Sequence, residues 1–190
     1  MMKITLPKSL DDMTLRTYVA IETAKSDVDR VCAITGVKRK LVEQFSYNAV
    51  SEILDLYNEI STNVTSRHYA TFNLGGTRFG FIPDLDAMTF REHVDLEAYA
   101  STIWLPNGET DYRELPNLVA ILFRPVSAIM GEYYEIDKYD TDKVKRYLPK
   151  LLDVKMSQVY GALVFFSTIE SELILNTVAS ITSEIQTMAS

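Results

Sequence analysis

A change of hydrophobic period near residue 69 restricts the fold of this chain more than any other feature of its sequence. Apolar side chains take alternate positions in Tyr69–Leu74 and in Thr77–Ile82, and the two runs meet at Gly75-Gly76. Two glycines accept the positive φ angles of a tight primed turn, so these residues predict a β-hairpin near 69–82, which Pro83 ends. An isolated hairpin is marginally stable in water, and we therefore expect one of its faces to lie on helices or on further strands.

Most of the remaining sequence has helical periodicity. Apolar residues three and four positions apart predict helices that begin near Thr14, Ser26, Ser46 and Thr89. The side-chain oxygens of Thr14, Ser46 and Thr89 are expected to cap the first turns. Gly36 is expected to end the second of these helices, because glycine readily adopts a left-handed conformation. At Thr89, a hydroxyl residue with a Glu three positions later is typical of a capping box.

Two prolines are expected to end or interrupt helices in the second half of the chain. A helix over about 116–124 must end near Arg124, because Pro125 disfavours helical geometry in the residue before it. The Arg124 side chain is expected to hold the fold there, by bonding free carbonyl groups or by pairing with an acid such as Asp95. A later short helix is expected to be interrupted by Pro149.

The C-terminal segment has the most regular helical pattern. Ser157 is expected to cap a helix that runs to about Met188, which divides the chain into a helical body, residues 1–156, and a long C-terminal helix, residues 157–190. The first half of this helix is apolar on more than one face, whereas the second half narrows to a stripe typical of a short coiled-coil seam. Two interpretations stay open, because the stripe fits either another protein or an antiparallel helix of the same domain. The stripe consists of Ile174, Val178, Ile181, Ile185 and Met188.

Composition and charge narrow the classes of function. The 190 residues include 19 Lys and Arg against 26 Asp and Glu, whereas a general nucleic-acid binder needs a basic face to displace counterions from phosphate. The single cysteine, Cys32, excludes an internal disulfide and multi-cysteine zinc sites, and its apolar neighbours indicate a small core residue. The longest apolar run, 118–123, is far shorter than a bilayer requires, and no apolar signal region follows Met1. We therefore expect folding in a cytosol, with neither a membrane nor a specific nucleic acid as partner.

Residues that could carry chemistry are few. Two Asp-x-Asp patterns, beginning at Asp84 and at Asp140, shortly precede predicted helices and are expected to cap them. His68 and His93 are expected to be solvated, and no nucleophile–base pair or phosphate-binding loop is present in the sequence. We therefore expect no catalytic residue, no cofactor and no metal, and a protein that is not an enzyme. The alternative is a metal-dependent hydrolase or transferase that uses Asp84, Asp86 and His93.

Aromatic residues are numerous, with eleven tyrosines and eight phenylalanines. Core packing explains most of them, but the segment 133–139 interleaves tyrosines with charged residues, a pattern typical of protein interfaces. The predicted partner-binding residues are therefore Ile174, Val178, Ile181, Ile185, Tyr133 and Tyr134.

Several segments together resemble small proteins that tailed bacteriophages encode among their virion morphogenesis genes. The segments are Lys3–Pro7 with Met13–Leu15, FGFIPDLDAMTFREHVDLEAY (79–99), ILFRPV (121–126), YEIDKYD (134–140) and YGALVFF (160–166). The resemblance implies a role in virion assembly or structure, similar to tail-assembly chaperones or to neck and capsid accessory proteins. It implies synthesis in the host cytoplasm, a place in the virion as a second location, and other phage structural or assembly proteins as partners. It transfers no catalytic residue.

Together these observations predict a single, mainly α domain with one β-hairpin (α+β) and a long C-terminal helix. We expect it to act through protein–protein contacts, with a homo-oligomer among its assemblies. A phage regulator that binds a host protein is the alternative function of the same class of surface.

Overall fold

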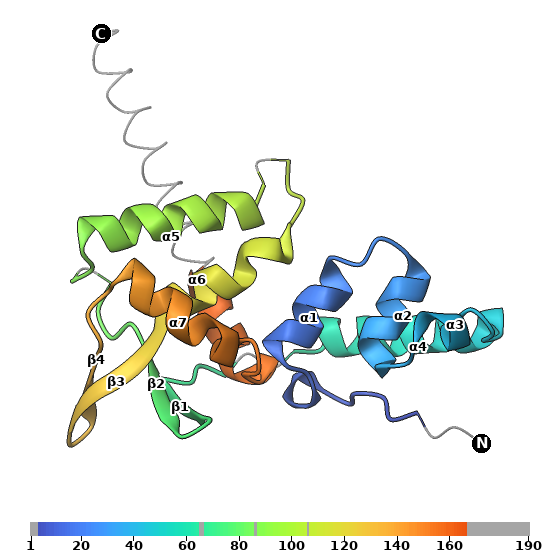
Figure 1. The fold of residues 1–190 in the computed structure, drawn as a ribbon, viewed down its shortest axis with the longest axis horizontal. Coiled ribbons are helices and arrows are strands. Elements are labelled where there is room, and N and C mark those ends of the chain that lie inside the picture. Colours follow the sequence, from blue (N-terminus) through green and yellow to red (C-terminus); the bar gives the residue numbers. More distant parts are fainter. Residues whose placement is uncertain (1–3, 65–66, 86, 106, 167–190) are drawn as a thin grey trace, which may run out of the picture.

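The computed structural model describes residues 4–64, 67–85, 87–105 and 107–166, and it confirms a mainly α fold that contains the predicted β-hairpin (Figure 1). A further helix, which carries no label in Figure 1, covers residues 156–166. The labelled α-helices and strands, with two short 3₁₀ turns (η), are η1 (Leu10–Asp12), α1 (Leu15–Glu22), α2 (Asp27–Thr35), α3 (Arg39–Val42), α4 (Tyr47–Thr62), β1 (Thr71–Leu74), β2 (Thr77–Phe81), α5 (Phe90–Ile103), η2 (Tyr112–Glu114), α6 (Leu115–Leu122), β3 (Phe123–Met130), β4 (Tyr133–Ile136) and α7 (Thr141–Leu151).

Three of the predicted helix caps, Thr14, Ser46 and Thr89, are confirmed, and Ser26 caps α2 as well. The side-chain oxygens of Thr14, Ser26, Ser46 and Thr89 each accept a hydrogen bond from a backbone N–H in the first turn of α1, α2, α4 and α5. These bonds satisfy donors that have no partner inside the helix. Helix α2 ends at Gly36, which has the left-handed φ of 68° that its position predicted.

The predicted hairpin forms one half of a four-stranded antiparallel sheet with the strand order β1-β2-β3-β4. Gly75 and Gly76 connect β1 to β2 with φ angles of 51° and 76°, as a primed two-residue turn requires. The sheet continues because β2 also pairs with β3, with Phe81 opposite Phe123. Further strands therefore support the hairpin, which is one of the two arrangements expected from the sequence.

The segment around Pro125 differs from the sequence prediction. Helix α6 ends at Leu122, and Arg124 and Pro125 lie inside strand β3 rather than at a helix terminus. Pro125 lies opposite Phe79, a residue whose backbone groups point toward β1, so the sheet loses no hydrogen bond to β2 at the proline. The preceding run 118–123 is apolar at every position, and periodicity alone could not show where helix changes to strand.

Two other boundaries also differ from expectation. Helix α7 continues through Pro149 to Leu151, so the proline does not interrupt it. The last described helix begins at residue 156, so Ser157 lies within its first turn instead of capping it, and the Ser157 hydroxyl bonds to the Asp11 carboxylate. The predicted stripe, with Ile174, Val178, Ile181, Ile185 and Met188, lies outside the described residues.

Helix α7 and the helix 156–166 pack on the face of the sheet where the aromatic residues of the strands gather. Phe79, Phe81 and Phe123 are buried on this face. The Phe79 ring meets Tyr147 of α7 with 5.8 Å between ring centroids, and the Phe81 ring meets Phe165 of the helix 156–166 at 6.1 Å. We call this the aromatic face of the sheet.

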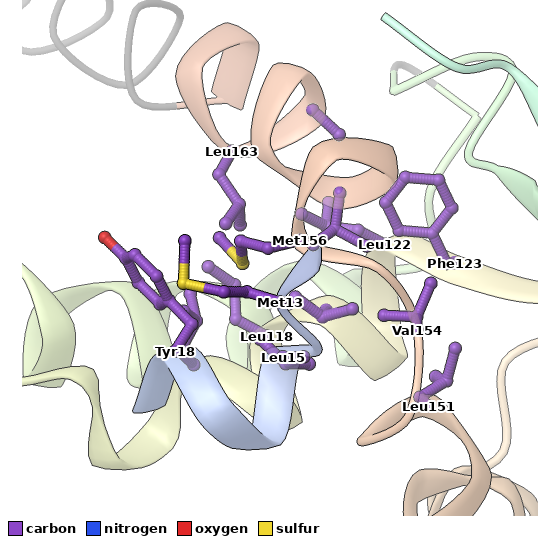
Figure 2. Close-up of a cluster of buried hydrophobic side chains, with 14 of the residues drawn as sticks. Met13, Leu15, Tyr18, Leu118, Leu122, Phe123, Leu151, Val154, Met156 and Leu163 are labelled. Atoms are coloured by element: carbon purple, nitrogen blue, oxygen red, sulfur yellow. The ribbon is translucent and has the colours of Figure 1, made fainter. Parts of the chain in front are cut away.

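The segment that precedes α1 closes the hydrophobic core. Leu15 N donates to Val154 O at 2.8 Å, and Met156 N donates to Met13 O at 2.8 Å, so the two distant segments pair through their backbones. Their side chains join those of α6 and of the helix 156–166 in one buried cluster (Figure 2). The residues labelled in Figure 2 are Met13, Leu15, Tyr18, Leu118, Leu122, Phe123, Leu151, Val154, Met156 and Leu163.

Candidate interaction site

The tip of the β3–β4 hairpin carries large apolar side chains in solvent. Ile129 is 54% exposed, Met130 is 56% exposed and Tyr133 is 79% exposed, on either side of the turn formed by Gly131 and Glu132. The other large apolar residues of the strands are buried or half-buried, so this cluster is a departure from the rest of the sheet. We call Ile129, Met130 and Tyr133 the hairpin tip.

The two tyrosines that the sequence predicted as partner-binding point to opposite faces of β4. Tyr133 belongs to the exposed tip. The Tyr134 side chain reaches across β3 to β2, where its hydroxyl donates to Phe81 O at 2.8 Å. The Tyr134 ring fills the space above Gly80, where an added Cβ would lie 2.5 Å from Cε2 of the ring. Burial raises the pKa of the Tyr134 hydroxyl. Tyr133 is therefore available to a partner, and Tyr134 attaches the hairpin to β2.

A buried ion pair holds the base of this hairpin to α5. Arg124 Nη2 lies 2.6 Å from Glu92 Oε1, and the two side chains are only 7% and 4% exposed. The Tyr139 ring lies over the Arg124 guanidinium, 5.8 Å from Cζ to the ring centroid, and its hydroxyl donates to Asp95 Oδ2 at 2.7 Å. Glu92 and Asp95 are one helical turn apart, so one side of α5 holds both β3 and the segment that follows β4.

The partner of Arg124 differs from the acid that the sequence suggested. Arg124 was expected to pair with an acid such as Asp95, but it contacts Glu92, and Asp95 bonds to Tyr139 and Arg91 instead. The physical reason is the position of Arg124 in β3, which directs its side chain toward the start of α5. Glu92 takes part in two contacts. Its carboxylate pairs with Arg124, and its backbone N–H donates to the capping oxygen of Thr89.

The sequence identified only one residue of the hairpin tip, Tyr133. Ile129 and Met130 were missed because the segment 125–132 was not assigned to a strand. A signal was present in the sequence, since Gly131 lies between two short apolar runs, as in a hairpin with a glycine turn.

The residues of the alternative metal-dependent enzyme, Asp84, Asp86 and His93, belong to other segments of the chain than the hairpin tip. His93 is exposed on α5, where Nδ1 lies 3.5 Å from Glu97 Oε2, and Asp86 lies outside the described residues. Among the residues that the structure describes, no three or more His, Cys, Asp or Glu gather closely enough to hold a metal ion. Cys32 is partly buried, and burial is the main cause that raises the pKa of its thiol.

One cavity, of about 410 Å³, lies between the N-terminal segment, the end of α4 and the start of the helix 156–166. Its lining mixes the basic side chains of Lys8 and Arg67 with the acidic side chains of Asp11 and Glu59. The Asp11 carboxylate is already bonded to Ser157, and the Arg67 guanidinium lies over the Tyr69 ring. The lining charges are of both signs and partly engaged with other side chains, so the charge of the lining does not indicate one class of ligand.

Within the described ranges, no helix combines the length and the apolar character needed to cross a bilayer. The chain matches no protein-family model, no curated protein and no solved structure.

Proposed function

We propose that this chain acts through protein–protein contacts as a bacteriophage protein in virion assembly or structure, and that the hairpin tip makes one of these contacts. The observation that carries the contact is the exposure of Ile129, Met130 and Tyr133 together at the end of one hairpin. Aromatic residues and methionine are enriched in the centres of interfaces, where they bury a large area. The phage context rests on the sequence segments that resemble virion morphogenesis proteins.

The base of the hairpin supports this assignment. The side chains of Glu92 and Arg124 are buried together, and the Tyr139 hydroxyl bonds to Asp95 of the same helix. A hairpin that is fixed at its base presents its tip in one orientation before a partner arrives. Less ordering is then needed on binding, and this increases affinity.

The test is a phage that carries Met130→Asp and Tyr133→Asp in this gene, with particle yield and particle shape as the measurements. We expect the yield to fall at least about tenfold, because a charged side chain that is buried in an interface without a partner costs more than about 1.4 kcal/mol. The matched control is Tyr47→Asp, since Tyr47 is 86% exposed and lies in the first turn of α4.

A yield equal to wild type for the hairpin variant, with the variant folded by circular dichroism, would overturn the proposal. Equal losses for the hairpin variant and for Tyr47→Asp would also overturn the assignment of the contact to the hairpin tip. Mass spectrometry of purified particles then shows whether the chain stays in the virion or acts only during assembly.

A further inference from the structure

The sheet has two edges whose backbone groups have no strand partner among the described residues, because β1 pairs only with β2 and β4 pairs only with β3. Leu74 and Thr77 close the first hairpin, and Met130 and Tyr133 close the second, each around a two-residue turn. Hydrogen-bonded pairs alternate with non-bonded pairs in an antiparallel ladder, so the N–H and C=O of the next residues point outward. Asn73 on β1 and Tyr134 on β4 are these residues.

The number of strands makes the two edges compatible with each other. In a sheet of four antiparallel strands, β1 and β4 run in opposite directions. A second copy displaced sideways, without rotation, therefore brings its β1 antiparallel to β4 of the first copy and continues the same face of the sheet. An odd number of strands would have made this pairing parallel.

The chain segments that contain the two edges also carry opposite charge, although the strand β1 itself (Thr71–Leu74) has no charged residue. Residues 125–137, which include most of β3 and all of β4, contain Glu132, Glu135 and Asp137 and no Lys or Arg. Residues 67–82, which include β1 and β2, contain Arg67, His68 and Arg78 and no Asp or Glu. The Arg78 guanidinium reaches β1, where Nη2 donates to Thr71 Oγ1 at 3.0 Å. Pairing of β4 with β4 of another copy would place two acidic hairpins side by side, whereas pairing of β4 with β1 places the acidic hairpin beside the basic one.

The two edges are covered by helices on different faces of the sheet. On the aromatic face, α7 lies against the first hairpin, where Lys150 Nζ donates to Gly75 O at 3.1 Å. On the opposite face, α5 lies against β3 through Glu92 and Arg124. The aromatic face therefore lacks a helix at the exposed residues Met130 and Tyr133, and a neighbouring copy would bring its own α7 to that side (Figure 1).

We propose that a second copy of this chain pairs its β1 with β4 of the first, so that copies associate head to tail through a continuous antiparallel sheet. This inference rests on the proposed function and deepens it, because it names the partner of the hairpin tip as another copy. Two different surfaces meet in such an interface, so the association continues into a ring or a filament unless the ends are capped.

The test uses two variants, each with one altered edge, and sedimentation velocity over a range of protein concentrations. Glu132→Lys/Glu135→Lys reverses the charge of the β4 edge. Asn73→Pro/Arg78→Glu reverses the charge of the β1 edge and removes an outward N–H that no ladder bond uses. Arg78→Glu alone serves if the proline variant does not fold by circular dichroism.

We expect the wild type to self-associate in low salt, and each variant alone to associate at least about tenfold more weakly. An equal mixture of the two variants should form a one-to-one heterodimer, because the first keeps an intact β1 edge and the second keeps an intact β4 edge. Glu52→Lys/Asp55→Lys on α4 makes the same change of charge as the β4-edge variant at a distant exposed site and should associate like the wild type.

Several results would overturn the inference. A wild type that stays monomeric at every concentration removes it, and so do variants that associate like the wild type. Association that is lost in the β4-edge variant but kept in the β1-edge variant indicates β4–β4 pairing. Association that is lost only in the β1-edge variant excludes β4 from the contact, and a mixture that stays monomeric excludes head-to-tail pairing. If the chain is monomeric while Met130→Asp/Tyr133→Asp still lowers particle yield, the proposed function stands and only this inference fails.

Discussion

The two hairpins of the sheet have turns of the same size, but their turns have different environments. The β1–β2 turn is tied to α7, since Lys150 Nζ donates to Gly75 O at 3.1 Å and to Thr77 Oγ1 at 2.8 Å. The β3–β4 turn projects instead, with Met130 and Tyr133 exposed beside it (Figure 1). The first hairpin is held at its turn and packs against α7. The second hairpin is held at its base and leaves its turn in solvent.

Exposure of the second hairpin is compatible with a well-defined position. Its base is held by the Glu92–Arg124 pair and by Tyr134, whose hydroxyl bonds to Phe81 O. A buried ion pair gives little net stability, because desolvation offsets most of the attraction between the charges. Its contribution here is therefore direction, since it fixes β3 against α5.

The largest expected effect breaks the base of the second hairpin. Glu92→Met leaves the Arg124 guanidinium buried without a counter-charge, so we expect the free energy of unfolding to fall by about 3–5 kcal/mol. The double variant Glu92→Met/Arg124→Met removes both charges and should recover most of this loss. Urea denaturation measures the free energy of unfolding of Glu92→Met, of Arg124→Met and of the double variant. A double variant no more stable than Glu92→Met would show that the pair itself stabilises the fold.

The next effect concerns the close approach between β2 and β4. Gly80→Ala places a Cβ 2.5 Å from Cε2 of the Tyr134 ring and 3.0 Å from Cγ2 of Ile136, so we expect a loss of about 1–3 kcal/mol from overpacking. The added loss should be smaller in a Tyr134→Leu background, where the ring is absent. A double-mutant cycle by urea denaturation measures the coupling, and additive losses would contradict the contact.

The pH dependence of stability compares how deeply two tyrosine hydroxyls are buried. Burial raises the pKa of Tyr147, which packs on the first hairpin, and raises the pKa of Tyr134 on the second. A raised pKa means that the unfolded chain releases the proton first, so stability is full below about pH 10 and falls as pH rises above it. One such tyrosine contributes a slope of at most about 1.4 kcal/mol per pH unit.

Tyr147→Phe should therefore flatten the alkaline loss of stability more than Tyr134→Phe does, because Tyr147 is the more deeply buried of the two. Urea midpoints measured between pH 8 and about pH 11, where unfolded tyrosine titrates, give the two slopes. The opposite order of slopes would show that the second hairpin packs more tightly than the first.

A smaller effect is expected at the turn of the first hairpin. Lys150→Met removes the donor to Gly75 O and Thr77 Oγ1, and we expect a loss of about 1 kcal/mol. Amide hydrogen exchange at Thr77 should become faster. Lys143→Met, on the exposed side of α7, is the matched control and should leave both measurements unchanged. Equal effects of the two substitutions would show that the turn does not depend on Lys150.

The smallest effect on stability is expected at the hairpin tip. Tyr133→Ser should change the free energy of unfolding by less than about 0.5 kcal/mol, because this side chain is largely in solvent. The same substitution at Tyr134 should cost clearly more, since its ring and hydroxyl contact β2. Thermal melts of the two variants make the comparison, and equal losses would show that Tyr133 also packs on its own chain.

Local signals in the sequence were sufficient for a large part of the fold. Thr14, Ser46 and Thr89 cap helices as predicted, α2 starts where Ser26 indicated, and Gly75-Gly76 forms the predicted turn. Caps and tight turns depend on interactions within a few residues, so single positions report them. Strand β3 was missed for the opposite reason, because Pro125 and the uniformly apolar run before it give no period, and only pairing with β2 makes that segment a strand.

The candidate site was predictable only in part. The aromatic and charged segment after β3 directed attention to Tyr133 and Tyr134, but both tyrosines look alike in the sequence. Their separation into an exposed and an attached residue depends on the face of β4 that each one occupies, and a strand must be paired before its faces are defined.

Local sequence patterns were enough for the capped starts of α1, α2, α4 and α5 and for the first hairpin, because these depend on contacts between neighbours along the chain. The tertiary structure alone decided that a second hairpin extends the sheet, that Glu92 rather than Asp95 pairs with Arg124, and that Met130 and Tyr133 remain in solvent. These features depend on contacts between residues far apart in the sequence. Local patterns do not distinguish the possible partners of a residue, and only the close packing of the folded chain selects one of them.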